Sequence, residues 1–186
     1  MRTSKGLVIQ SIIVAVSVLL LKAAMGEEKQ FPGKILFERM VGEWTSEGKL
    51  TSPVSGDVIK VTESWVGKFN EGGGSFTIEG DRIWNGETQT FKWEYSYNAT
   101  TESLEVIYTA SSLDKELSME VSVNEAEGII SLLAPMGSDG AEIQIENKFV
   151  KDKLVSQVVL KGNDGQTVLE GAMKHSQEKK GNKKNE

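Results

Sequence analysis

The fold of this chain is decided by the stretch ILFERMVGEW at residues 35–44. Its first part is apolar and compatible with a helical turn, and it ends in Gly42-Glu43-Trp44, after which strand-like segments follow one another. A helical turn that leads into a Gly-x-Trp strand is typical of small closed β-barrels, in which the indole fills the narrow end. The stretch therefore predicts a first strand that begins near Gly42 and a Trp44 that is buried at a closed barrel end.

Outward from Trp44, apolar side chains occupy every second position of several segments. The pattern is clearest at 91–97 and at 117–123. A period of two is the signature of a strand that has one face in a core and one face in water. The segments that we predict as strands are 44–50, 58–66, 75–79, 82–85, 91–97, 104–110, 117–123, 129–133, 143–149, 154–160 and 168–173.

The connections between these segments are rich in turn residues. They include Ser55-Gly56-Asp57, Gly72-Gly73-Gly74, Asn85-Gly86, Ser138-Asp139-Gly140 and Asn163-Asp164-Gly165. Asn-Gly and Asp-Gly tolerate the positive φ angles of tight hairpins, so consecutive strands are expected to pair antiparallel. Because no second amphipathic helix is visible, the sheet must close into a barrel or stack as a sandwich. We predict an all-β fold, a single antiparallel up-and-down β-barrel of about 8–10 strands with a short N-terminal capping helix.

The N-terminal segment predicts export. Two basic residues precede an apolar run at 7–21, and a basic residue and small residues follow it as far as Gly26, which is the layout of a signal peptide. The run is shorter than the ~20 residues that span a bilayer, so a retained anchor is the second possibility. The predicted organisation is a signal peptide at 1–26, one barrel domain at 27–176 and a disordered charged tail at 177–186.

Charge and cysteine content limit the possible binding partners and the cellular compartment of the protein. The segment up to Gly26 holds three basic and no acidic residues, so the remainder has 18 Lys and Arg against 27 Asp and Glu, a formal charge of −9. This balance argues against nucleic acid and against anionic membrane surfaces as partners. The chain has no cysteine, which excludes a disulfide framework and lipid attachment through cysteine. We expect a periplasmic or extracellular protein without an integral membrane segment after processing.

The helical turn, the Gly42-Glu43-Trp44 opening and the aromatic stretch 83–95 resemble the exported bacterial lipocalin-like proteins of the calycin type, a family of domains of unknown function. The likeness extends from about Leu36 to Lys174 and implies a lipocalin-like barrel. In lipocalins a basic side chain of the last strand covers the motif's Trp, and the resemblance assigns this role to Lys174. Haem-binding barrels of the nitrobindin kind are similar in outline, but their Gly-x-Trp-x-Gly-x-Gly opening is absent here.

Catalytic and metal-binding chemistry finds few candidate residues. His175 is the only histidine, and we expect it at the surface, where the last strand runs into the tail. Because the chain has no cysteine and one histidine, few residues could form a zinc site or carry out nucleophilic catalysis. No turn has the acidic pattern of a calcium-binding loop. We predict no catalytic residue, no metal and no cofactor. The sequence does not decide whether the protein is an enzyme, and it favours a protein without catalytic activity.

Glu63 is the polar position that bears most on binding. If Val61 and Trp65 face inward, Glu63 shares their face, and a carboxylate inside a barrel must be paired, hydrated or protonated. A bulge or a bend would instead turn it outward. The candidate ligand-binding residues are Glu63, Trp65, Phe76, Trp93, Tyr95 and Tyr108, with Tyr97 as a further inward tyrosine.

Two functions are compatible with this sequence. In the first, the exported lipocalin-like barrel is a non-enzymatic binder that holds a small apolar or amphipathic molecule among its aromatic side chains. In the second, the barrel is filled by its own side chains and serves as a structural or interaction protein of the cell envelope. Large aromatics suit both functions, so the size of an internal cavity has to separate them. The oligomeric state stays open.

Overall fold

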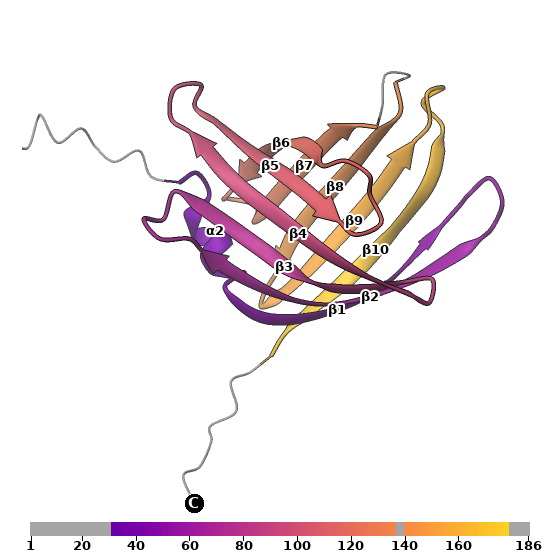
Figure 1. The fold of residues 1–186 in the computed structure, drawn as a ribbon, viewed down its shortest axis with the longest axis horizontal. Helices are drawn as coiled ribbons and strands as arrows, with labels where there is room; N and C mark the ends of the chain where they lie inside the picture. The colour runs from indigo at the N-terminus through magenta and orange to yellow at the C-terminus, as the bar shows by residue number, and fades with distance from the viewer. Residues whose placement is uncertain (1–30, 137–139, 179–186) are drawn as a thin grey trace, which may run out of the picture. The chain divides into compact units, whose positions relative to one another are not determined.

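The chain forms a closed β-barrel in a computed structural model that describes residues 31–136 and 140–178 (Figure 1). Within these residues, every strand pairs antiparallel with its neighbours in the sequence, and the first strand pairs with the last. The strands are β1 (Gly42–Thr51), β2 (Val58–Phe69), β3 (Ser75–Trp84), β4 (Glu87–Asn98), β5 (Ser103–Ala110), β6 (Leu117–Asn124), β7 (Ile129–Pro135), β8 (Glu142–Val150), β9 (Lys153–Lys161) and β10 (Thr167–Gln177). The predicted all-β, up-and-down barrel is therefore confirmed. The predicted signal peptide at 1–26 lies outside the described residues.

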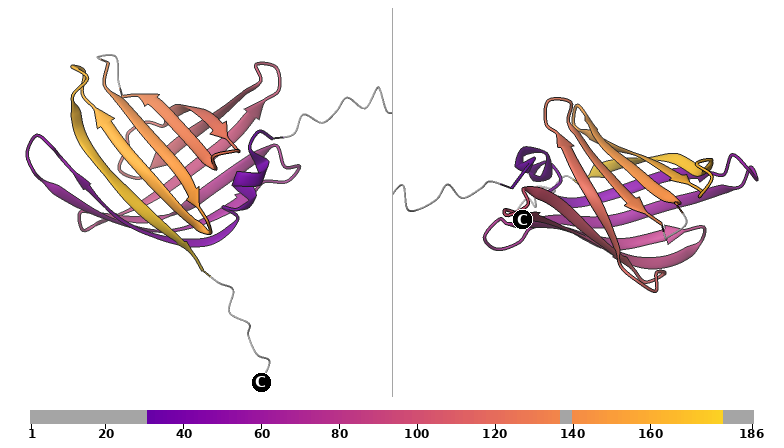
Figure 2. Two further views of the ribbon diagram at one scale, coloured as in Figure 1. Left: turned by 180° about the vertical axis from the view of Figure 1, so that it is seen from behind. Right: turned by 90° about the horizontal axis from the view of Figure 1, so that it is seen from above.

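One end of the barrel is capped by the short helix α2 (Lys34–Glu38), which begins after Gly33 in the left-handed conformation. Figure 2 shows α2 at this end, while the hairpin between β1 and β2 extends at the other. Leu36 and Phe37 are buried, and the Phe37 ring centroid lies 5.2 Å from that of Phe76 and 5.0 Å from that of Tyr95. Edge-on and tilted contacts of this kind are the favoured arrangements of packed aromatic rings. The predicted capping helix is confirmed.

Trp44 is buried at the same end, as its Gly-x-Trp motif predicts. Its indole stacks on that of Trp65, with ring centroids 5.2 Å apart and planes within 5° of parallel. The Trp44 Nε1 group donates a hydrogen bond of 3.1 Å to the backbone oxygen of Met40, just after α2. The indole thus ties the first strand to the capping helix.

Lys174 does not cover Trp44, so the role implied by the resemblance is wrong. Lys174 lies on β10 between the buried residues Met173 and His175, and its own side chain is exposed. Because successive side chains of a strand point to opposite faces, a residue between two inward neighbours must point outward. Trp65 supplies the cover instead.

The predicted break between 75–79 and 82–85 is wrong, because both segments belong to the single strand β3. Gly80, which lies between the two predicted segments, is paired with Trp65 of β2 in the middle of the ladder. A Cβ atom at Gly80 would lie 2.0 Å from the backbone oxygen of Ser64. The missing side chain therefore lets β2 and β3 approach closely, which is a common use of glycine within strands.

The last strand also extends beyond its predicted end at residue 173. β10 runs to Gln177, which pairs with Trp44 of β1 and so belongs to the barrel rather than to the predicted tail. This extension brings His175 into the sheet. In the described part of the chain, no helix has the length and apolar character needed to cross a membrane.

Replacement of Trp44 tests the architecture of the closed end. Trp44→Ala should lower the free energy of unfolding by about 3–5 kcal/mol, because a large packed side chain and its stacking on Trp65 are lost. Lys174→Ala is the control, and it should change stability by less than about 0.5 kcal/mol because the side chain is exposed. Urea unfolding of the three proteins measures both changes. A stable Trp44→Ala protein, or equal losses in both variants, would contradict this placement of the two residues.

Candidate functional site

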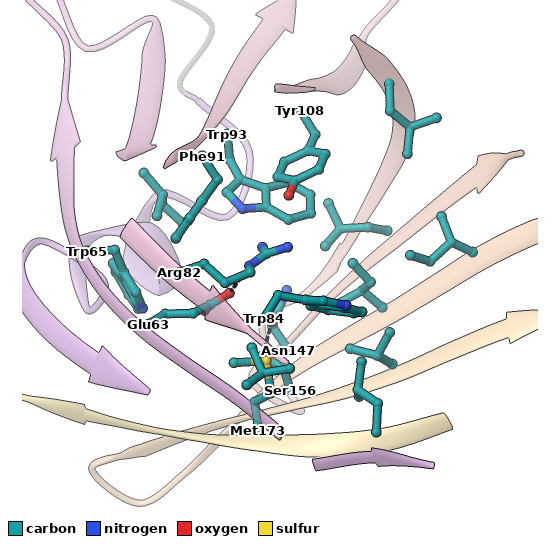
Figure 3. Close-up of a pocket in the computed structure, with 18 of the residues that line it drawn as sticks. Glu63, Trp65, Arg82, Trp84, Phe91, Trp93, Tyr108, Asn147, Ser156 and Met173 are labelled. Atoms are coloured by element: carbon teal, nitrogen blue, oxygen red, sulfur yellow. Dashed lines mark hydrogen bonds and ion pairs between the residues drawn. The ribbon is translucent and has the colours of Figure 1, made fainter. Parts of the chain in front are cut away.

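The barrel encloses a cavity of about 560 Å³ (Figure 3). It extends from Met40, beside α2, to Leu113 and Met136 in the connections that follow β5 and β7 at the opposite end. Most of its wall is aliphatic or aromatic. The polar and aromatic residues of the wall that bear on recognition are Glu63, Trp65, Arg82, Trp84, Phe91, Trp93, Tyr95, Tyr108, Asn147, Ser156 and His175.

A charged pair lies in this mainly apolar wall. Glu63 of β2 and Arg82 of β3 are directly opposite each other in the ladder, and Arg82 Nε donates a hydrogen bond of 2.8 Å to Glu63 Oε1. Both side chains are largely buried, at 9% exposure for Glu63 and 14% for Arg82. Burial raises the pKa of Glu63, and the charge and hydrogen bond of Arg82 partly oppose this shift. Of the two orientations open to Glu63, the inward one is found.

The guanidinium of Arg82 is surrounded by aromatic rings. Its central carbon lies 4.9 Å from the ring centroid of Phe91 and 5.7 Å from those of Trp84 and Tyr108. A cation held over ring faces is stabilised by their quadrupoles, more so where water is excluded. Burial raises the pKa of Tyr108, an effect that Arg82 opposes, so this phenol stays protonated at neutral pH. The rings hold the cation in place inside the cavity.

His175 is buried inside the barrel, which corrects the predicted surface position. Its Nδ1 atom lies 2.6 Å from Ser46 Oγ of β1, and its Nε2 atom lies 2.7 Å from Ser156 Oγ of β9. The prediction failed because His175 follows a lysine near a polar tail, whereas its strand phase is that of buried Met173. That shared phase is the signal in the sequence that could have placed it inside.

The hydrogen bonds around His175 indicate which of its ring nitrogens carries the proton. Ser156 Oγ donates to Asn147 Oδ1 at 2.5 Å, so Ser156 accepts the hydrogen of His175 Nε2. In a neutral imidazole the proton then lies on Nε2, and Nδ1 accepts from the Ser46 hydroxyl. Ser46 Oγ in turn accepts from Trp65 Nε1 at 2.9 Å. Burial lowers the pKa of His175 to about 4, which agrees with the neutral form.

The predicted ligand-binding residues divide between the cavity and the closed end. The cavity is lined by Glu63, Trp65, Trp93, Tyr95 and Tyr108. Phe76 is absent from this wall, because it is fully buried beneath α2 in contact with Phe37 and Phe69. Tyr97 packs against the core but does not reach the cavity either.

Several polar residues of the wall are not among the predicted site residues. Arg82 and Trp84 follow the predicted break between 79 and 82, which left their phase in β3 undefined. Asn147 shares the strand phase of Ile145 and Phe149, and Ser156 shares that of Leu154, so alternation places both inward. Their hydrogen bond to each other across the β8–β9 ladder is what only the structure shows. Within 31–136 and 140–178, no group of three His, Asp or Glu side chains is arranged to hold a metal ion.

Comparisons with known proteins bear on the fold. No protein-family model matches the sequence, and no curated protein matches it. Among solved structures, the chain is similar to the crystal structure of Rv2717c from M. tuberculosis, with a TM-score of 0.55 and 11% sequence identity. The match covers 81% of this chain and 100% of that chain. At this level of identity the likeness supports the barrel architecture alone.

The buried imidazole predicts a loss of stability in acid. In the unfolded chain His175 takes up a proton near its ordinary pKa of about 6.5, whereas in the barrel it resists protonation down to about 4. The unfolded state therefore binds more protons in this window, and the contribution of His175 falls by about 3 kcal/mol as the pH falls through it.

Urea unfolding at a series of pH values measures this loss, with His175→Gln as the control. The raised pKa of Glu63 acts in the opposite direction, but it is common to both proteins and cancels in their difference. Stability of the wild type should therefore fall more steeply with acidification than that of the variant. Parallel curves for the two proteins would show that His175 titrates alike in the folded and unfolded states.

Proposed function

We propose that this protein is a non-enzymatic binder that holds a small, mainly apolar molecule inside its barrel. The observation that carries the proposal is the cavity of about 560 Å³. Ligand sites typically measure about 300–1,000 Å³, are lined by aliphatic and aromatic side chains, and contain a few polar groups that orient the guest. The wall fits this description, with the Glu63–Arg82 pair and Asn147 as its polar groups.

The filled-barrel alternative accounts only for the end of the interior next to α2. Next to α2, aromatic side chains such as Phe37, Phe69 and Phe76 occupy the barrel completely. Around Trp84 and Trp93 the inward side chains are only partly buried, because they face the cavity. A barrel that served only as a scaffold would gain stability from filling this space, since an unfilled interior forgoes packing contacts.

The polar groups favour binding over catalysis. Both nitrogens of His175 are engaged by serine hydroxyls, and its proton lies on the nitrogen that faces Ser156, so Ser156 has no base to activate it. The Glu63 carboxylate is held by Arg82. These groups are arranged to fix one another and to orient a guest.

Export and family membership are part of the same proposal. The basic, apolar and small-residue segments of 1–26 support secretion, to the periplasm or outside the cell. The helix-capped up-and-down barrel supports membership of the lipocalin-like calycin-type family, whose barrels have this architecture.

Native mass spectrometry of the purified protein tests the proposal. A bound molecule should appear as added mass that disappears on denaturation, and it should raise the melting temperature, because a ligand that binds only the folded state stabilises it by mass action. Ile145→Trp, which places a larger side chain in the cavity wall, should remove the added mass. Ile107→Trp on the outer face of β5 is the matched control and should retain it.

Two results would count against the proposal. One is an empty protein whose melting temperature fails to respond to a screen of apolar compounds. The other is a bound mass that is equally present in the Ile145→Trp and Ile107→Trp proteins, because the molecule would then lie outside the barrel.

A further inference from the structure

The cavity wall contains several hydrogen-bond donors that no described protein group accepts from. The indole N–H groups of Trp44 and Trp65 donate hydrogen bonds to protein oxygens. No described residue accepts a hydrogen bond from the indole of Trp84 or of Trp93, both of which line the cavity. The amide nitrogen of Asn147 is also a donor, since its oxygen is taken by Ser156. A guest that fills this space meets N–H groups on several sides.

Arg82 is the strongest of these donors. A guanidinium carries five N–H groups, and the Nε group is engaged by Glu63. The Tyr108 hydroxyl is a second hydrogen-bond partner of this side chain. The rings of Trp84 and Phe91 hold the guanidinium without accepting a conventional hydrogen bond, so some of its N–H groups are left for a guest. Figure 3 shows the guanidinium projecting from Glu63 toward Tyr108, so its terminal nitrogens lie within the cavity.

Glu63 sets the charge that the cavity tolerates. Among the buried groups of the wall, the negative Glu63 and the positive Arg82 balance, and the neutral His175 adds nothing. The exposed Glu87, which also lines the cavity, adds a further negative charge. A carboxylate guest at Arg82 would leave a net negative charge in a poorly hydrated space, beside the Glu63 carboxylate. A cationic guest would compete with Arg82 for Glu63. A neutral guest with an acceptor atom gains the Arg82 hydrogen bond and avoids both costs.

We propose that the cavity selects a neutral, largely apolar molecule whose polar end is a carbonyl-type acceptor, that Arg82 receives this oxygen, and that Glu63 excludes the corresponding carboxylate. The proposal rests on the binding function proposed above and names the class of its ligand. Arg82 is a binding residue in this account. Glu63 determines specificity by occupying the charge of Arg82.

Three probes of one shape test the selection. They are acetylnaphthalene, isopropenylnaphthalene and naphthoate, substituted at the same ring position, so that the ketone, the hydrocarbon and the carboxylate differ only in the polar group. Calorimetric titration of the purified protein at neutral pH measures each Kd. The ketone should bind about 10-fold more tightly than the hydrocarbon, as expected for a hydrogen bond to a charged donor. The carboxylate should bind at least about 10-fold more weakly than the ketone.

Removal of the Glu63 charge should reverse this preference. In Glu63→Gln the affinity for naphthoate should rise about 10-fold or more, because Arg82 is then uncompensated, while that for the ketone stays within about 3-fold. Glu94→Gln is the matched control, since Glu94 pairs with Lys92 and lies outside the cavity wall. Its preferences should equal those of the wild type. The double variant Glu63→Gln with Arg82→Met removes both charges, and in it the ketone should lose its advantage over the hydrocarbon.

The outcomes separate this inference from the function on which it rests. Naphthoate that binds the wild type as tightly as the ketone, or that gains nothing in Glu63→Gln, overturns the selection and leaves the binding function standing. Failure of all three probes to bind the wild type contradicts the binding function and the inference together. If Glu63→Gln does not fold, a ketone advantage that persists in the double variant overturns the role of Arg82.

Discussion

The pairing of β1 with β10 is the constraint on which the rest of the structure depends. It closes the sheet and removes both edges, and its register decides which side chains meet inside. Ser46 lies opposite His175 on one side and opposite Glu63 on the other, and Glu63 lies opposite Arg82. A row of polar residues thus crosses four neighbouring strands. A shift of one residue in the closure would turn one part of this row to the outside.

The barrel interior has two parts, one densely packed and one that encloses the cavity. Beside α2, aromatic rings such as Phe37 and Tyr95 meet edge-on or tilted, and burial there is complete. Toward the open end the wall keeps its aromatic character but encloses free volume and a charged pair. A buried ion pair of this kind adds little net stability, because desolvation offsets most of the attraction. The closed half therefore provides the packing that holds the polar half in position.

The sequence predicted the class of fold well because that information is local. Alternation within segments such as 91–97, turn dipeptides such as Asn85-Gly86, and the Trp44 motif each act over a few residues. The site was harder to predict because its polar members are defined by partners across the ladder. The pairing of Arg82 with Glu63, and the position of His175 between Ser46 and Ser156, follow from the register of the barrel. Phe76 was assigned to the site for the opposite reason, since phase alone says that a side chain is inward and not which end of the barrel it fills.

The closure also has a consequence for how the chain folds. The hydrogen bond between Ser46 and His175 spans 129 positions of the sequence, and the ladder that contains it joins the first strand to the last. Hairpins can form one after another as the chain emerges, but the ring cannot close before β10 is present. Contacts of such large sequence separation make folding slow, because a long loop must be ordered before they form. Until that final step the chain remains an open sheet of hairpins with two unpaired edge strands. In that form it can still be unfolded and drawn out into an extended chain.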